Sequence, residues 1–312
     1  MNLSVCSARR CCRMEVMPTI VLGWVCLQVS SLERSQAFYE RIGLRTALLK
    51  PPFAVLTSAD TATALLILWE RPGTHPAAPD MTGLYHVALR LPGETALAGV
   101  LRHLLRQGIP LEGASDHLVS QALYLSDPDG NGIELYADRP RHTWQRRNGE
   151  LLMATRPLDV ERLLSRAPAP LPVLPEGTSI GHLHLRVAQL DAAERFYAGM
   201  LGLEVQLRSY PGALFFAADG YHHHIGVNTW GAPRRLPSEH TAGLVLFTLG
   251  HSNEVFHQLR RRCQPAAIAQ QEQWMVLSDP WRHRLLITPL PALPTTPEAA
   301  VGMLNQLLQV LQ

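Results

Sequence analysis

The fold is decided by two pieces of sequence, Thr82-Gly-Leu-Tyr-His-Val-Ala-Leu89 and Tyr124-Leu-Ser-Asp-Pro-Asp-Gly-Asn-Gly-Ile-Glu-Leu-Tyr136. The first alternates apolar and polar residues, as a strand with one buried face does, and carries His86 at its centre. The second holds a run of turn-forming residues at 127–132 and continues into a strand that carries Glu134. A histidine and a glutamate held on two rigid strands can converge on a metal ion.

The same strand and helix pattern recurs along the chain, and such repeats decide the architecture. Gly23-Trp-Val-Cys-Leu-Gln-Val29 aligns with Gly181-His-Leu-His-Leu-Arg-Val187, and each is followed by an amphipathic helical pattern that ends at Gly-Leu. Gly83 to Pro140 likewise matches Gly243 to Pro289. We therefore expect an α+β protein of four βαβββ modules, with boundaries near 19–72, 82–140, 179–232 and 240–290.

These modules suggest a domain organisation. Residues 1–17 lack the apolar core of a signal peptide and predict a disordered leader. Residues 18–140 hold modules one and two, and residues 178–290 hold modules three and four. Between them, residues 141–177 include a proline-rich run, which predicts a stiff linker. Residues 291–312 predict a helical tail whose apolar spacing forms a docking face made of Leu304, Leu307, Leu308 and Leu311.

Composition excludes several classes of protein. The chain has 312 residues, of which 46% are apolar, which is enough for two domains of ordinary size. A formal net charge of +2 does not favour a nucleic-acid partner. No apolar run approaches the roughly 20 residues needed to cross a membrane. The five cysteines show no regular spacing, which favours a reducing cytoplasm over a disulfide framework. The composition leaves open whether the chain forms a homo-oligomer.

Several motifs in order resemble the vicinal oxygen chelate superfamily, which includes glyoxalases, bleomycin resistance proteins and extradiol dioxygenases. The motifs are the Phe-Tyr helix that ends at Gly-Leu and the turn and strand at 127–134. Asp116-His-Leu-Val-Ser120, the segment from Tyr124 to Pro140, and Gly220-Tyr-His-His-His-Ile-Gly-Val-Asn-Thr-Trp230 resemble the catechol 2,3-dioxygenase-like branch. The resemblance covers about 20–290.

The resemblance implies that the modules pair into two half-open mixed-sheet barrels, with ligands on the first and last strand of each module. Extradiol relatives use two histidines and one carboxylate, which leave adjacent positions open on Fe(II). The first-strand positions hold Trp24, His86 and His182, and the fourth module offers no histidine there. The last-strand positions hold, in order, an aliphatic residue near Leu66, Glu134, the histidine tract 222–224 and Leu286.

Only modules two and three together supply a full ligand set, which is His86, Glu134 and His182. We therefore expect modules two and three to share one barrel and modules one and four to share the other, which would be metal-free. This departs from the family's commonest pairing of sequence neighbours. His184 lies two residues beyond His182, on the same strand face, and is the main rival for its role.

The resemblance also implies three catalytic residues. Alternation along a strand allows either His223 alone or both His222 and His224 to point inward. The resemblance maps His223 to an acid–base histidine beside the bound oxygen. Tyr124 maps to a tyrosine that hydrogen-bonds the substrate oxygen, and His117 would orient it or assist proton transfer. Other candidates for lining the pocket are Tyr85, Asp116, Arg139, Trp144 and Trp230.

The sequence therefore predicts an extradiol dioxygenase that cleaves the ring of a catechol-like vicinal diol with O₂. It would depend on Fe(II), with Mn(II) as the alternative metal. A glyoxalase-type isomerase or lyase on the same scaffold is a second reading, although such enzymes often use two carboxylates and only one is found here. A third is a non-catalytic small-molecule binding protein of the bleomycin type, and a fourth is a relic that has lost its activity.

Overall fold

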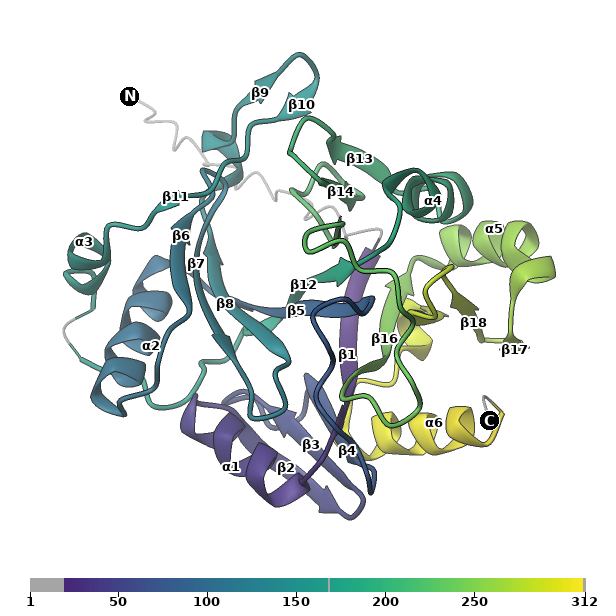
Figure 1. Ribbon diagram of the computed structural model, residues 1–312, viewed down its shortest axis with the longest axis horizontal. Helices are drawn as coiled ribbons and strands as arrows, with labels where there is room; N and C mark the ends of the chain where they lie inside the picture. The colour runs from purple at the N-terminus through teal and green to yellow at the C-terminus, as the bar shows by residue number, and fades with distance from the viewer. Residues whose placement is uncertain (1–19, 168, 311–312) are drawn as a thin grey trace, which may run out of the picture.

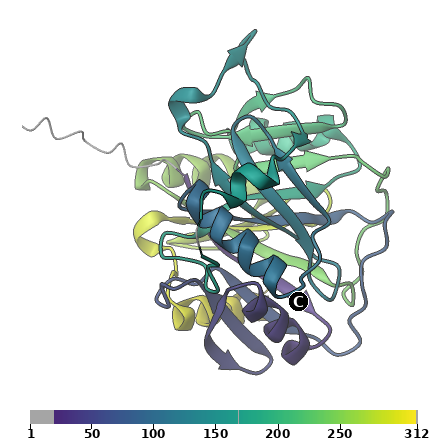
Figure 2. The same ribbon diagram turned by 90° about the vertical axis from the view of Figure 1, so that its left-hand side faces the viewer.

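The computed structural model describes residues 20–310 except residue 168 (Figures 1 and 2). The leader expected at 1–17 and Leu311 lie outside the described residues. Module one comprises β1 (Ile20–Val29), α1 (Leu32–Arg41), β2 (Arg45–Lys50), β3 (Phe53–Thr57) and β4 (Leu66–Glu70). Module two comprises β5 (Gly83–Leu91), α2 (Glu94–Arg106), β6 (Gly113–Asp116), β7 (Ser120–Ser126) and β8 (Gly132–Asp138).

The second half of the chain repeats this order. Module three comprises β12 (Ser179–Arg186), α4 (Leu190–Glu194), the π-helical turn η2 (Arg195–Met200), β13 (Glu204–Leu207), β14 (Ala213–Ala217) and β15 (Ile225–Asn228). Module four comprises β16 (Gly243–His251), α5 (Asn253–Cys263), η3 (Gln264–Ala266), β17 (Ala269–Gln271), β18 (Trp274–Ser278) and β19 (Arg284–Pro289). The chain then continues into η4 (Leu290–Ala292) and α6 (Pro297–Val310).

Most described strands lie in two curled mixed sheets, each shared by two modules. One sheet has the order β11-β6-β7-β8-β5-β12-β15-β14-β13 and joins modules two and three. The other has the order β17-β18-β19-β16-β1-β4-β3-β2 and joins modules one and four. The antiparallel pairs β5–β12 and β1–β16 lie at the two junctions, near the middle of the molecule in Figure 1. The fold class and the predicted pairing of modules are therefore confirmed.

Alternation along the strands separates the core from the barrel interior. Val87 and Leu89 on β5 point to one face of the sheet and pack with Leu101 of α2 in the main hydrophobic core. His86 and Ala88 point to the other face, into the half-barrel. A shift of one residue in register would exchange the two sets, so burial of the core face fixes which side chains enter the barrel.

The helix α6 fills the half-barrel that modules one and four share. Inward-facing Trp24, Ile67, Leu246 and Leu286 are all fully buried, and they pack against Ala300, Val301, Leu304 and Leu307 of α6. Leu308 is partly buried beside them. This barrel interior is an apolar core, and the inward-facing side chains at its ligand positions offer no atom that binds a metal.

Two buried tyrosine–aspartate hydrogen bonds connect the barrels. The Tyr39 hydroxyl on α1 donates to Asp127 Oδ2 across 3.1 Å, from module one to module two. The Tyr197 hydroxyl on η2 donates to Asp279 Oδ2 across 2.9 Å, from module three to module four. Both tyrosines are fully buried. Because each bond joins modules of different sheets, the pair fixes how the two barrels sit against each other.

The segment between the halves does more than space them. It forms η1 (Arg141–Thr143), β9 (Arg146–Arg147), β10 (Glu150–Leu151), β11 (Arg156–Pro157) and α3 (Val160–Leu164). β11 adds to the edge strand β6, and α3 packs on α2. Figure 1 shows β9 and β10 near β13, at the far end of the sheet that modules two and three share, whereas α3 lies beside α2 on the outside. No helix in the described part of the chain is long and apolar enough to cross a membrane.

Candidate metal centre and its cavity

The three predicted ligands come together on adjacent strands. Glu134 on β8 lies beside Ala88 of β5 in parallel register, and His182 on β12 lies opposite Ala88 in antiparallel register. His86 is two residues from Ala88, so its side chain points to the same face of the sheet. All three side chains therefore enter the half-barrel of modules two and three from neighbouring strands.

Their polar atoms form a compact triangle. Glu134 Oε2 lies 2.9 Å from His86 Nε2 and 3.0 Å from His182 Nε2, and the two imidazole nitrogens are 3.3 Å apart. Ligand atoms about 2.1 Å from a metal and about 90° apart would be about 3.0 Å from each other. Within the described part of the chain, His86, Glu134 and His182 bring their ligand atoms within 4.8 Å of one another, close enough to hold one metal ion.

The surroundings of His182 and Glu134 favour the protonation states that a metal needs. The three residues are at most 6% exposed. Burial lowers the pKa of His182 to about 4, so its imidazole is neutral at pH 7. Burial alone would raise the pKa of Glu134, but the imidazoles of His182 and His86 lower it well below its usual value. Two imidazoles and one carboxylate fit a divalent metal such as Fe(II) or Mn(II).

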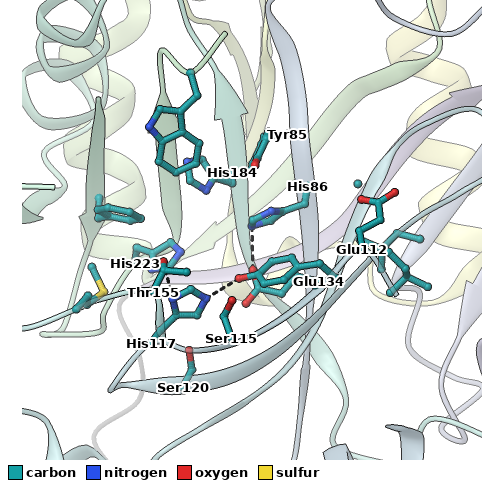
Figure 3. A pocket seen from close by; sticks show the side chains of 18 of the residues that line it. Tyr85, His86, Glu112, Ser115, His117, Ser120, Glu134, Thr155, His184 and His223 are labelled. Atoms are coloured by element: carbon teal, nitrogen blue, oxygen red, sulfur yellow. Dashed lines mark hydrogen bonds and ion pairs between the residues drawn. The ribbon is translucent and has the colours of Figure 1, made fainter. Parts of the chain in front are cut away.

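Two of the three ligands, His86 and Glu134, line a cavity of about 510 Å³, and His182 is not among its lining residues. The volume suits a small-molecule ligand. Figure 3 shows His86 and Glu134 on one side of this cavity and His117, Thr155 and His223 on another. Aromatic side chains form much of the remaining wall, and they are Tyr85, Tyr124, Tyr210, Phe215 and Trp230.

His117 and Tyr124 form a hydrogen-bonded pair at the cavity wall. His117 Nδ1 lies 2.9 Å from the carbonyl oxygen of Ala154, which can only accept, so Nδ1 carries the proton. In the neutral imidazole, Nε2 then accepts a bond from the Tyr124 hydroxyl across 2.6 Å. Burial raises the pKa of Tyr124 well above its usual value, and the nearby charge of Glu134 adds to this effect. The Tyr124 oxygen can still accept a hydrogen bond from a ligand in the cavity.

His223 lines the same cavity, and its ring centroid lies 4.0 Å from that of His182. Its Nδ1 lies 2.7 Å from Nδ1 of His222, and His222 Nε2 lies 2.9 Å from Asp138 Oδ1. Because the Asp138 carboxylate can only accept a hydrogen bond, His222 Nε2 carries the ring proton. The neutral ring then presents a bare Nδ1 that accepts a hydrogen bond from Nδ1–H of His223. His223 therefore keeps Nε2 for contact with a ligand.

Asp138 and His222 were not predicted as parts of the site. The sequence did hold a signal for Asp138, because it follows Glu134 by four residues on β8 and a strand places such residues on the same face. The histidine tract differs from the expectation in one respect, because 222–224 precedes β15 and does not belong to it. The register of β12 and β15 instead places Gly226 at the position equivalent to Glu134.

The remaining candidates divide into two groups. Tyr85, Trp230 and the rival ligand His184 line the cavity, and the Nε2 atom of His184 is buried without a partner among the described residues. The other candidates are not among the residues that line it. Asp116 and Arg139 form an ion pair across 2.6 Å, and Trp144 packs on the rings of Tyr221 and His222. The segment between the halves adds Met153, Ala154 and Thr155 to the wall.

Sequence comparison agrees with this geometry. A family model described as the Glyoxalase/Bleomycin resistance protein/Dioxygenase superfamily matches residues 21–135 and 179–264. These matches include most of modules one to three and the start of module four. The chain belongs to this superfamily.

The chain lies on the catechol 2,3-dioxygenase-like branch of the superfamily. Catechol-2,3-dioxygenase of Bacillus subtilis (strain 168) is 45% identical over 244 residues, which cover 75% of this chain and 84% of that relative.

Solved structures support the fold alone. A putative dioxygenase from Bacillus subtilis subsp. subtilis str. 168 superposes with a TM-score of 0.59 at 14% identity, covering 95% of this chain and 97% of that one. Glyoxalase I from Zea mays superposes with a TM-score of 0.52 at 13% identity, covering 87% and 93%. Both share the arrangement of elements, and neither identity is high enough to transfer a function.

Proposed function

We propose that this protein is an extradiol dioxygenase that uses Fe(II) and O₂ to cleave the ring of a catechol-like vicinal diol. The observation that carries the proposal is the triangle of His86, Glu134 and His182, of which His86 and Glu134 line an aromatic-walled cavity. Two histidines and one carboxylate on one face of a metal are typical of non-haem iron oxygenases. The Bacillus relative named catechol-2,3-dioxygenase supports the choice of substrate class.

The three ligands would hold Fe(II), which supplies Lewis acidity toward the diol and one-electron chemistry toward O₂, and Mn(II) suits the same ligand set. The site residues carry the rest of the chemistry. Tyr85, Phe215 and Trp230 offer ring faces and edges against which an aromatic substrate packs. The cavity volume of about 510 Å³ admits a single-ring diol with substituents.

Two groups would handle protons. Tyr124 accepts a proton from a diol hydroxyl and passes its own to His117 Nε2, along the 2.6 Å hydrogen bond between them. His223 exchanges a proton at Nε2 with the reacting oxygen, since its Nδ1 is held by His222. Both groups lie at the cavity wall on sheet or turn segments that Ala154 and Asp138 fix.

The overall reaction adds both atoms of O₂ to the diol and opens the ring beside the two hydroxyls, giving an aldehyde and a carboxylic acid. The test is to load the metal-free protein with ferrous iron and catechol under argon and then admit air. We expect an absorbing ring-opened semialdehyde to form in the wild type and not in Glu134→Gln. Absence of ring-opened product from catechol and its simple alkyl and carboxyl derivatives would refute the proposal.

Two broader properties belong to the same proposal. The lack of a regular cysteine pattern supports a cytoplasmic location, where free thiols persist. Cys26 and Cys263 are both free and buried, in agreement with that environment. Assembly into a homo-oligomer would leave the site complete within each chain, because all three ligands come from one chain.

A further inference from the structure

We propose that a second cavity, between the two barrels, binds a small organic anion with an apolar body. This cavity has a volume of about 820 Å³ and lies where strands and turns from all four modules meet. Its wall includes Gln28 of module one, Gly130 of module two, Arg186 of module three and Arg282 of module four. The proposal does not depend on the dioxygenase assignment, because none of the three candidate metal ligands lines this cavity.

Three arginines give the cavity its positive charge. Arg186 ends β12, Arg282 lies in the turn before β19, and Arg284 begins β19. Arg186 and Arg284 are half-buried, and Arg282 is exposed. Within residues 20–310, 168 aside, no carboxylate forms an ion pair with any of the three, although Arg186 lies over the ring of Tyr85 at 5.3 Å. Half-buried guanidinium groups without a carboxylate favour an external anion.

The acidic side chains that line the cavity are already neutralised. Asp129 Oδ1 lies 2.6 Å from Arg34 Nη2 and accepts from the Ser30 hydroxyl across 2.6 Å. Glu239 Oε2 lies 2.7 Å from Arg71 Nη2. Both carboxylates therefore have cationic partners of their own, so the charge they could offer to Arg282 or Arg284 is engaged elsewhere.

The turn before β19 holds Arg282 and Arg284 close to each other. Asp279 Oδ1 accepts the backbone N–H groups of Trp281 and His283, each across 2.9 Å, and Asp279 is 4% exposed. Arg282 lies between these anchored residues with a φ of 68°, a left-handed conformation that few non-glycine residues adopt. Burial, and then the charge of Arg282, lower the pKa of Arg284. Two like charges are thus kept close by a rigid turn, and an anion would relieve their repulsion.

The rest of the wall selects an organic molecule over a bare inorganic ion. Trp69, Val245 and Leu308 line the cavity and are partly buried against the apolar core of the second barrel. Burying an apolar body on such a surface removes hydrocarbon from water and is favourable. The ligand class is therefore a compact carboxylate or phosphate ester with a hydrocarbon or aromatic portion.

The cavity also adjoins the candidate active site. Gly130 and Arg186 line both cavities, and Tyr85, on which the Arg186 guanidinium lies, belongs to the wall of the first. An anion that binds Arg186 in the second cavity would therefore contact a side chain that also borders the first cavity.

The test is a calorimetric titration of the full-length protein with benzoate, with hexanoate and with inorganic phosphate. We expect saturable binding of benzoate and hexanoate with a dissociation constant no weaker than about 1 mM. Phosphate should bind at least about tenfold more weakly, because it has no apolar portion. No heat of binding with either organic acid up to about 10 mM would overturn the proposal, and phosphate binding as tight as benzoate would overturn the claim of an apolar subsite.

Two double variants locate the site. Arg282→Gln with Arg284→Gln should weaken benzoate binding at least about tenfold. Arg106→Gln with Arg261→Gln removes the same charge from two exposed helical positions and should leave binding within about twofold of wild type. Thermal melts show whether each variant is folded. Equal affinity in the two double variants would overturn the assignment to this cavity, since the anion would then be bound elsewhere, for example by the histidines of the first cavity.

Discussion

The imidazole of His184 lies over Gly226, whose missing side chain makes room for it. A methyl group built at Gly226 would lie 3.2 Å from the His184 ring. In the other half of the same sheet the sizes are reversed, because the small Ala88 on β5 lies beside Glu134 on β8. The pseudo-symmetric pairs therefore put a carboxylate in one half and, in the other, an imidazole whose Nε2 has no hydrogen-bond partner in the described part of the chain. One carboxylate and two histidines can then share one face without crowding.

Gly226→Ala should consequently disturb the cavity. The added methyl group must push the His184 ring, and we expect a loss of unfolding free energy of about 1–3 kcal/mol. Chemical denaturation measures it. Gly302→Ala is the matched control, because a methyl group there, within α6, meets nothing within 4 Å. That change should be neutral or slightly stabilising. Equal stability of the Gly226→Ala protein and wild type would contradict the steric account.

The hydroxyl of Tyr39 should stabilise the whole molecule. Tyr39→Phe leaves the buried Asp127 carboxylate without the hydroxyl that it accepts from at 3.1 Å, and we expect a loss of about 1–3 kcal/mol. Tyr197→Phe, at the equivalent bond to Asp279, should cost a similar amount. Tyr210→Phe, whose hydroxyl bonds Thr155 at the surface, should cost well under 1 kcal/mol. The stabilising role of the two buried hydrogen bonds would be refuted if the denaturant midpoint fell as much in Tyr210→Phe as in Tyr39→Phe and Tyr197→Phe.

Acid should destabilise the protein through His224. Burial, followed by the nearby charge of His222, lowers its pKa to about 3. Between about pH 6.5 and pH 3 the unfolded chain therefore binds a proton that the folded chain does not. The unfolding free energy falls as the pH drops through this window, by at most about 1.4 kcal/mol per pH unit for this group. His224 is half-buried, so solvent reduces the effect.

The measurement is a series of denaturant melts of the metal-free protein from pH 7 to pH 4. His224→Gln should show a smaller decrease of stability with falling pH than wild type. A variant whose stability changes with pH as steeply as that of wild type would show that His224 does not contribute.

Asp138 should act on catalysis through His222. Asp138→Asn replaces the carboxylate that holds His222 Nε2 at 2.9 Å, so the hydrogen bond that fixes His223 is no longer specified. We expect kcat to fall about 10- to 100-fold with little change in KM. Asp116→Asn is the control, because Asp116 pairs with Arg139 and does not line the cavity. A loss of iron from Asp138→Asn, or an equal decrease of kcat in the control, would argue for a merely structural role.

Repeats and turn chemistry made much of this fold predictable from the sequence. The recurrent strand patterns predicted the four modules, and the distribution of His86, Glu134 and His182 over modules two and three predicted which modules share a sheet. Local sequence carried this information because each residue sits at a strand position fixed by alternation and by the turn at 127–132.

Other features depend on contacts between distant segments, so no local pattern revealed them. The leucine spacing of α6 predicted a docking face. It did not reveal that Leu304 and Leu307 would fill the barrel of modules one and four. The Asp138–His222 hydrogen bond joins residues that are 84 positions apart in the sequence. Thr155 lines the cavity although it comes from a segment that was expected only to be a spacer. The place of the histidine tract before β15 reflects a local turn that overrode the alternation expected of a strand.

The most direct test of the central claim is the ferrous iron content of four proteins after anaerobic loading and gel filtration. Wild type and His184→Ala should each retain about one iron per chain, because His184 is not part of the triangle, whereas Glu134→Ala and His182→Ala should retain almost none. Iron at wild-type occupancy in Glu134→Ala, or its loss only in His184→Ala, would contradict a metal centre built from His86, Glu134 and His182.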